Sequence, residues 1–170
     1  MTSLALSLLT VIISALVAAL VSHWFIKRRE KESFQKEKLE ELYRAIVDFK
    51  TILDVALLNF ELYIHGKFTE KDYYESMTKG NVHRDDQTAS RRVEAIIYLW
   101  FPYFSDEWRD LDKKRSGAVT MMNPRAFECA DQENYAIQFR DRVNELDNKF
   151  SKILVLLSKE AKKLSKTKIV

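Results

Sequence analysis

The side chains that most often carry chemistry, histidine and cysteine, are few and widely separated in this chain. The histidines are His23, His65 and His83, and the one cysteine is Cys129. Zinc sites need ligands at short, recurring spacings, which these residues do not have. A lone cysteine forms no internal disulfide, and we interpret Cys129 as a small buried residue rather than a nucleophile. The sequence therefore predicts neither a metal site nor a cofactor.

Motifs for enzymatic catalysis are also missing. Residues 83–85 read His-Arg-Asp, the letters of a kinase catalytic loop, but the glycine-rich loop and the Asp-Phe-Gly motif of kinases are absent. No phosphate-binding glycine loop and no Gly-x-Ser-x-Gly elbow occurs. One predicted helix gathers four acids, which we interpret as a solvated face rather than as metal ligands: Asp106, Glu107, Asp110 and Asp112. We predict a protein that is not an enzyme and has no small-molecule substrate.

The most unusual stretch is aromatic and runs from residue 98 to residue 108 around Pro102. Its six aromatic residues are Tyr98, Trp100, Phe101, Tyr103, Phe104 and Trp108. They suit a docking patch, because tyrosine and tryptophan dominate interface hot spots. They equally suit a half-buried core at the membrane-distal end of a helical domain, which is the interpretation we prefer.

Nucleic acid is not an expected partner. Arginines lie near the aromatic stretch at positions 91, 92 and 109, and such residues can support base stacking. Acids are interleaved with them, however, and the net charge of the whole chain is only +3. A nucleic-acid-binding surface needs a clearer excess of positive charge.

These residues must be positioned by the rest of the chain, which begins with an uncharged stretch from Leu4 to Ile26. As a helix it would extend about 34 Å, enough to cross a bilayer core of about 30 Å. Positive residues that flank a span stay in the cytoplasm, so we predict an external N-terminus and a cytoplasmic C-terminal domain at a bacterial inner membrane. The predicted membrane-flanking residues are Trp24, Lys27, Arg28, Arg29 and Lys31.

Two further features belong to this predicted anchor, residues 1–26. Small residues recur every four positions at Thr10, Ser14, Ala18 and Ser22, and such stripes allow spanning helices to self-associate. The alternative is that alanine and serine are simply common in spans. Residues 27–38 follow as a charged juxtamembrane neck.

The remaining domain, residues 39–165, is predicted to be an all-α antiparallel helical bundle of two long helices and two or three short ones. Glycine and proline are scarce, with three and two residues, which favours long helices. Two seams alternate apolar residues by three and four positions, the pattern of packed helices. The first seam is Leu39, Leu42, Ile46, Phe49, Leu53, Ala56, Phe60 and Tyr63, and the second is Ala136, Phe139, Val143, Leu146, Phe150, Ile153 and Leu157. Six more apolar residues are predicted to widen the buried face of the first helix: Val47, Ile52, Val55, Leu57, Leu58 and Leu62.

Local signals predict the element boundaries. Gly66 ends the first long helix, and Thr69 caps a short one that stops near Gly80. A third helix is expected over residues 85–101, ended by Pro102, and a fourth from Ser105 to about residue 117. Residues 118–122 are predicted as a linker, and the pair at 123–124, Asn-Pro, begins one final helix to about residue 165.

The C-terminus is basic, and residues 166–170 form a basic tail. Five lysines are predicted to contact lipid headgroups if the last helix returns to the membrane, or else to form a frayed, solvated end: Lys159, Lys162, Lys163, Lys166 and Lys168. Together these features predict a membrane-anchored, non-enzymatic helical interaction or scaffold protein at the cytoplasmic face. Its expected partners are membrane lipid and either another protein or a second copy. The alternative is a membrane-active effector, such as a toxin, a pore component or a phage-exclusion protein.

Overall fold

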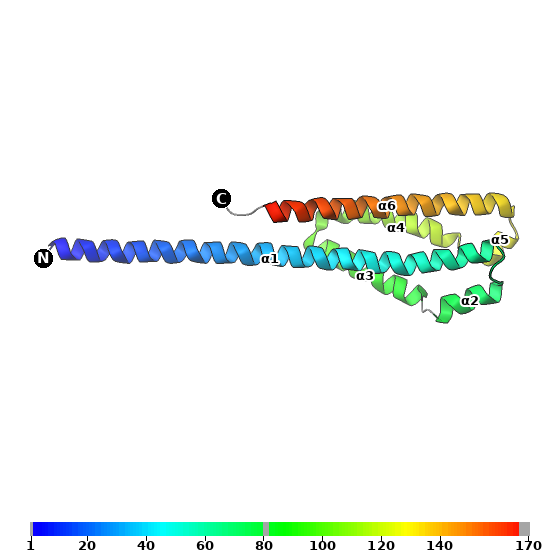
Figure 1. Ribbon diagram of the computed structural model, residues 1–170, viewed down its shortest axis with the longest axis horizontal. Helices are drawn as coiled ribbons and strands as arrows, with labels where there is room; N and C mark the ends of the chain where they lie inside the picture. Colours follow the sequence, from blue (N-terminus) through cyan, green and yellow to red (C-terminus); the bar gives the residue numbers. More distant parts are fainter. Residues whose placement is uncertain (1, 80–81, 167–170) are drawn as a thin grey trace. The chain divides into compact units, whose positions relative to one another are not determined.

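The computed structural model describes the backbone of residues 2–79 and 82–166, and the side chains of residues 17–79 and 85–165. The described residues form helices and no strand (Figure 1). The chain divides into two compact units, which are described separately below: residues 1–37 and the residues from Lys38 onward. The longest helix, α1, runs from Thr2 to Ile64 and contributes to both units.

In the first unit, the described side chains of α1 lie on the surface and contact one another locally. The rings of Trp24 and Phe25 meet edge to face, with centroids 5.1 Å apart. The guanidinium of Arg28 lies 5.5 Å from the Trp24 ring centroid and also pairs with Glu32 at 3.2 Å. These contacts link neighbouring turns of one helix, so they support α1 without adding a core.

The predicted membrane anchor needs correction. In the part of the chain that the structure describes, no helix is both long enough and apolar enough to cross a membrane. The uncharged run with described side chains, residues 17–26, would reach only about 15 Å along a helix, and charged residues follow from Lys27. Residues 4–16 of the predicted span lie outside the described side chains. The single-pass anchor, its orientation and the membrane location are therefore not supported.

The second unit is a helical bundle built on two long antiparallel helices, as the two seams predicted. The helix α6, Gln132–Lys166, runs back alongside the second part of α1 (Figure 1). The direction follows from two ring contacts. The ring centroids of Phe49 and Phe150 are 5.8 Å apart, while those of the later Phe60 and the earlier Phe139 are 5.0 Å apart. An ion pair between Lys50 and Asp147 at 2.8 Å fits the same antiparallel pairing.

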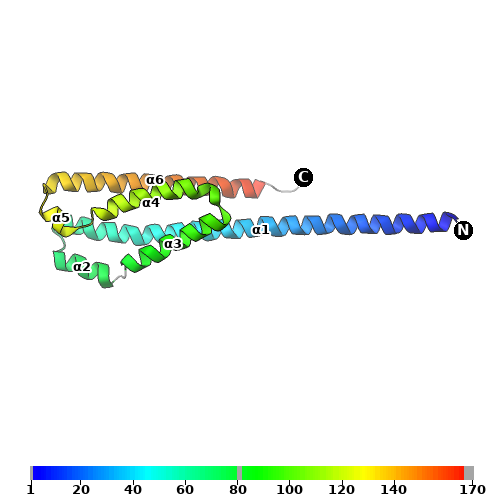
Figure 2. The same ribbon diagram turned by 180° about the vertical axis from the view of Figure 1, so that it is seen from behind.

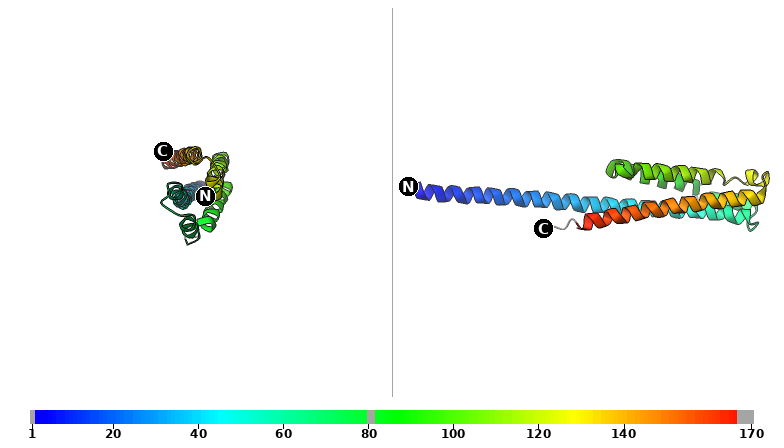
Figure 3. Two further views of the ribbon diagram at one scale, coloured as in Figure 1. Left: turned by 90° about the vertical axis from the view of Figure 1, so that its right-hand side faces the viewer. Right: turned by 90° about the horizontal axis from the view of Figure 1, so that it is seen from above.

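Shorter helices cover one side of this pair (Figure 3). They are α2, Glu70–Lys79; α3, Val82–Trp100; the 3-10 turn η1, Pro102–Phe104; α4, Ser105–Thr120; and α5, Pro124–Glu128. Helix α4 packs along α6, as the reverse view shows (Figure 2). All eight residues of the first predicted seam are buried, and so are five of the seven in the second, with the other two half-buried. The seam residues therefore form the core.

Several predicted boundaries are confirmed by their local geometry. Gly66 has a φ of 66°, in the left-handed region that ends helices readily at glycine. At the start of α2, the backbone N–H of Asp72 donates to the Thr69 hydroxyl at 3.2 Å. The Thr69 backbone N–H donates back to the Asp72 carboxylate at 2.9 Å, which completes a reciprocal cap. Asn123 accepts hydrogen bonds at the start of α5, as its position before Pro124 predicted.

Two predicted boundaries were wrong. Helix α4 continues through Gly117 to Thr120, where a linker was expected, because Ala118 is fully buried and its packing offsets the cost of about 1 kcal/mol for a helical glycine. The final helix is two helices, since α5 ends at Glu128 and α6 begins at Gln132. Asp131 starts α6: its carboxylate accepts from the backbone N–H of Asn134 at 3.4 Å, a cap that the sequence analysis missed.

Candidate functional site: surfaces and clefts of the helical unit

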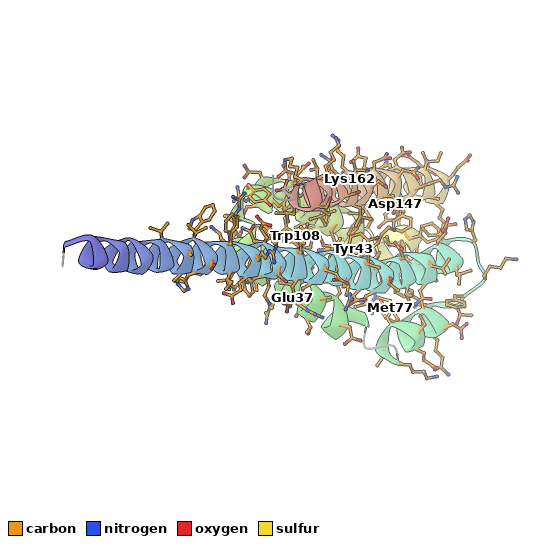
Figure 4. The ribbon with its side chains drawn as sticks, turned by 60° about the vertical axis from the view of Figure 1, so that its left-hand side comes forward. Glu37, Tyr43, Met77, Trp108, Asp147 and Lys162 are labelled. Carbon is orange, nitrogen blue, oxygen red and sulfur yellow. The ribbon has the colours of Figure 1, made fainter. Side chains whose placement is uncertain are left out.

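The aromatic stretch is divided between the core and the surface. Phe101, Phe104 and Trp108 are buried, as expected for a core, and they follow one another at the helical spacing of three and four residues. The Trp108 ring on α4 lies 5.4 Å from the Phe49 ring on α1, and Figure 4 labels this tryptophan. This half of the stretch joins α4 to α1.

The other half lies on the surface at the turn between α3 and η1. Four large side chains are exposed there, and we call them the aromatic corner: Tyr98, Leu99, Trp100 and Tyr103. Leu99, which the sequence analysis did not single out, is the most exposed large apolar side chain described, at 71%. Helix α3 ends at Trp100, just before Pro102, which begins the 3-10 turn η1.

Two rings of the aromatic corner, those of Tyr103 and Trp100, are fixed by contacts with other residues of the helical unit. Partial burial of the Tyr103 hydroxyl and its hydrogen bond to Glu160 on α6 raise the pKa of Tyr103 to about 12. The same ring lies 4.6 Å from that of the buried Phe104. The Trp100 ring lies 6.0 Å from the ammonium of Lys38. Such fixed rings lose little conformational freedom on binding, which favours recognition.

A second exposed apolar surface runs along α1, on the side away from the core. We call it the outer face, and its members are Tyr43, Val47, Thr51, Val55 and Leu58. The sequence analysis had assigned three of these residues to a widened core. Of the six residues predicted to widen it, only Leu57 is buried, while Ile52 and Leu62 are half-buried. The angular position of each residue about the helix axis, about 100° per residue, would have separated this face from the seam.

A polar cleft of about 260 Å³ lies between α3 and α4. Three arginines and two acids line it: Arg91, Arg109, Arg115, Glu94 and Asp112. Arg115 binds Asp86 and Asp112 at 2.8 Å each, so its charge is already matched within the protein. The lining contains neither histidine nor cysteine, and no pair of groups is arranged for acid–base or nucleophilic work.

The predicted acidic cluster on α4 is engaged in ion pairs. Asp110 binds Lys149 of α6, and the hydrogen bond from this ammonium holds the pKa of Asp110 below its usual range. Asp106 lies 3.3 Å from Arg109, and Asp112 contacts Arg115. Among the described residues, no group of three or more histidine, cysteine, aspartate or glutamate side chains is arranged to hold a metal ion.

A groove of about 320 Å³ separates α4 from α6 beside the Asp110–Lys149 pair. Its floor is apolar, with Ile153, Val155 and Leu156, and lysines stand at its rim. One rim residue, Lys159, belongs to the predicted headgroup contacts. Of the others, Lys162 and Lys163 are exposed on α6, Lys166 ends that helix, and Lys168 lies outside the described residues.

The remaining predicted residues lie apart from these surfaces. Trp24, Lys27, Arg28, Arg29 and Lys31 are exposed on α1 within the first unit. Ala18 and Ser22 of the small-residue stripe are exposed on the same helix, whereas the side chains of Thr10 and Ser14 lie outside the described set.

Cys129 does not match its expected burial. It is exposed, at the C-terminal cap of α5, because the chain turns there between α5 and α6. His23 and His65 are exposed as well, and the side chain of His83 lies outside the described set.

Comparison with known proteins adds no assignment, because no family model, no curated protein and no solved structure matches this chain.

Proposed function

We propose that the helical unit, from Lys38 onward, is a non-enzymatic interaction module that binds a protein partner through the aromatic corner. The carrying observation is that Tyr98, Leu99, Trp100 and Tyr103 are exposed, while the other aromatic residues of the same stretch are buried. Tryptophan and tyrosine are the residues that most often dominate binding energy at protein interfaces. Singly scattered apolar residues are normal on a surface, but here four large exposed side chains fall within six residues of the chain, a concentration typical of an interaction site.

The partner that fits this surface is a protein with an apolar patch and hydrogen-bond acceptors at its edge. Leu99 and the ring of Trp100 offer apolar area, and the exposed Tyr98 offers a hydroxyl donor beside it. The rings are already held in place by Lys38, Phe104 and Glu160, so binding orders little that was free. An arrangement of this kind supports binding without supporting catalysis.

Site-specific photo-crosslinking in cells tests this proposal, because the aromatic stretch contains its own controls. A photoreactive phenylalanine analogue at position 99 or 103 is expected to capture one partner. The same analogue at the buried positions 101 and 104 is expected to capture none. Position 74 on α2 carries an exposed tyrosine outside the corner and controls for contact by chance.

Capture then has to be reproduced with purified components. The captured protein is identified, purified and titrated against the wild-type chain, Leu99→Asp and Trp100→Ala. We expect each variant to weaken binding at least tenfold, the loss of about 1.4 kcal/mol or more that defines a useful hot spot. Equal capture at positions 99 and 101, or unchanged affinity in both variants, would refute the aromatic corner as the binding surface.

A further inference from the structure

The outer face of α1 carries apolar side chains that remain exposed in the described part of the helical unit. Its five residues follow one another at spacings of four, four, four and three, and fall within roughly 120° about the helix axis. Val47 is 37% exposed and Leu58 is 53% exposed. The opposite side of the same helix is sealed, with Leu42, Phe49 and Phe60 fully buried. Helix α1 therefore has one apolar side that packs in the core of the unit and one that stays exposed.

Charged residues on the side of the outer face lie at positions where opposite charges meet if two copies of α1 pair antiparallel. Arg44 lies near its start and Glu61 near its end, on the same side of the helix as Val47 and Leu58. If two copies of α1 run antiparallel about an axis between residues 52 and 53, Arg44 of each copy lies opposite Glu61 of the other. In the same pairing Val47 lies opposite Leu58, and Thr51 lies opposite Asp54. The layer of Arg44 and Glu61 is complementary in charge, and the layer of Val47 and Leu58 is apolar on both sides.

From this complementarity we propose that the outer face of α1 binds the outer face of a second copy of the chain in antiparallel orientation. The interface is isologous, so the same patch serves both copies and the assembly closes as a dimer. Residues 44, 47, 51, 54, 58 and 61 alternate by three and four, which is the spacing of a two-stranded seam. This surface is separate from the aromatic corner, and the inference stands independently of the proposed function.

The charges also select the orientation. A parallel pair would place each Arg44, Asp54 and Glu61 beside its own copy, and like charges in contact are unfavourable. In the antiparallel pair the two Asp54 carboxylates come close to each other near the axis. Each Asp54 is bound by Lys50 of its own chain at 2.8 Å, which offsets their repulsion.

The single chain makes these groups available at little cost. Arg44 forms an ion pair with Glu40 of its own helix, and both side chains are more than half exposed. Exposed ion pairs of this kind contribute little to stability, so Arg44 can exchange Glu40 for Glu61 of the second copy easily. Because polar layers weaken a helical seam, we expect a dissociation constant of micromolar order.

Sedimentation equilibrium of the full chain tests the dimer. A mild detergent keeps the uncharged residues 4–26 dispersed. We expect a dimer for the wild type at micromolar concentrations, and at least a tenfold weaker association for Leu58→Asp and for Arg44→Glu. Combining Arg44→Glu with Glu61→Arg restores the ion pairs in the opposite sense, so this double variant is expected to dimerise within about threefold of the wild type.

Two matched controls are available on α6. Val155→Asp introduces the same charge at an equally exposed apolar residue, and Arg140→Glu reverses an exposed arginine. Both are expected to leave the dimer unchanged. A monomeric wild type, a dimer that survives Leu58→Asp, or a double variant no better than Arg44→Glu alone would each overturn the proposal. Circular dichroism of every variant verifies that the helices are retained.

Crosslinking determines the orientation directly. In a Cys129→Ser background, Arg44→Cys and Glu61→Cys are introduced together and treated with a short bis-maleimide. The two positions lie about 25 Å apart on one helix, too far for a crosslink within one chain. We expect crosslinked dimers from the double-cysteine chain and from a mixture of the two single-cysteine chains, but not from either single-cysteine chain alone. Efficient crosslinking by one single-cysteine chain alone would indicate a parallel pair and refute the antiparallel interface.

Discussion

The inner face of α1, which is the first seam from Leu39 to Tyr63, and the outer face have a similar spacing of apolar residues but different surroundings. Both repeat apolar residues every three or four positions, yet the inner face is sealed by α4 and α6 while the outer face meets solvent. The outer face also carries charges, among them Arg44, Asp54 and Glu61. Among the described residues, no polar or charged residue is buried. An intramolecular core excludes charge because desolvation is costly, whereas charge on a surface selects a partner.

The aromatic stretch shows the same division over a much shorter distance. Phe104 and Tyr103 are neighbours, yet one is buried and the other is exposed at the aromatic corner. Residue type alone does not distinguish them, since both are large and aromatic. The 3-10 turn after Pro102 decides which of them faces the core. Side-chain identity therefore predicts that a contact will form, but not whether it forms within the chain or with a partner.

The largest expected effect separates the two faces of α1 by stability. Phe49→Ala removes a fully buried ring that contacts Phe150 and Trp108, and it should lower the free energy of unfolding by about 3–5 kcal/mol. Val47→Ala, two residues earlier on the outer face, should change it by less than about 1 kcal/mol. Urea unfolding followed by circular dichroism measures both. Comparable losses would mean that the outer face is packed within the unit, and the contrast between the two faces would be lost.

A smaller effect should appear at alkaline pH, and two buried tyrosines, Tyr63 and Tyr73, contribute to it. Burial raises the pKa of Tyr73 to about 12, and burial together with a hydrogen bond to Glu128 raises the pKa of Tyr63 above its usual range. Unfolded tyrosine ionises near pH 10, so the stabilisation is complete below about pH 10 and is lost as the pH rises above it. For Tyr73 we expect a loss of about 1 kcal/mol by about pH 11.

Tyr73→Phe provides the comparison, with Tyr43→Phe on the outer face as its control. The pH dependence of the unfolding free energy between about pH 9 and 11 should be shallower for Tyr73→Phe than for the wild type. Tyr43 is 47% exposed, so its replacement controls for the loss of a tyrosine hydroxyl at the surface. A steeper slope for Tyr73→Phe would show that the sign assigned to this ionisation is wrong.

The smallest effect concerns Gly66, which follows the C-terminal end of α1. Gly66 has a φ of 66°, and a Cβ atom there would meet nothing within 4 Å. Gly66→Ala should therefore cost about 1 kcal/mol for backbone conformation alone. Gly117 lies inside α4, where alanine is favoured by about 0.5–1 kcal/mol and only the flexible end of Arg142, at 3.2 Å, has to move. Thermal unfolding should give opposite signs for the two variants.

Much of the bundle follows from the sequence because its signals are local or strictly periodic. The seam from Leu39 to Tyr63, the stop at Gly66 and the cap at Thr69 depend on neighbouring residues, and the structure confirms them. Residues 118–120 were wrongly assigned to a linker, because burial of Ala118 against the core outweighs the local preference of Gly117, whereas residues 121–122 do lie outside the helices. The single last helix was predicted wrongly because the cap at Asp131 lies within an otherwise helical pattern.

The predicted anchor followed from one sequence feature, the uncharged stretch from Leu4 to Ile26. The structure does not support it, since no helix in the described part of the chain meets the length and hydropathy that a span requires. The small-residue stripe and the basic flank were interpreted only in the light of that anchor. They therefore carry no functional conclusion here.

By itself, the sequence determined that this protein is helical, where its two seams lie and that it lacks catalytic and metal-binding motifs. Those properties depend on residue type and on spacing along the chain, and both can be read from the sequence alone. Only the tertiary structure decided which half of the aromatic stretch is exposed and which apolar residues of α1 remain uncovered. Burial depends on which helices pack around each residue, and in this chain those helices, α4 and α6, lie more than 40 residues further along the sequence.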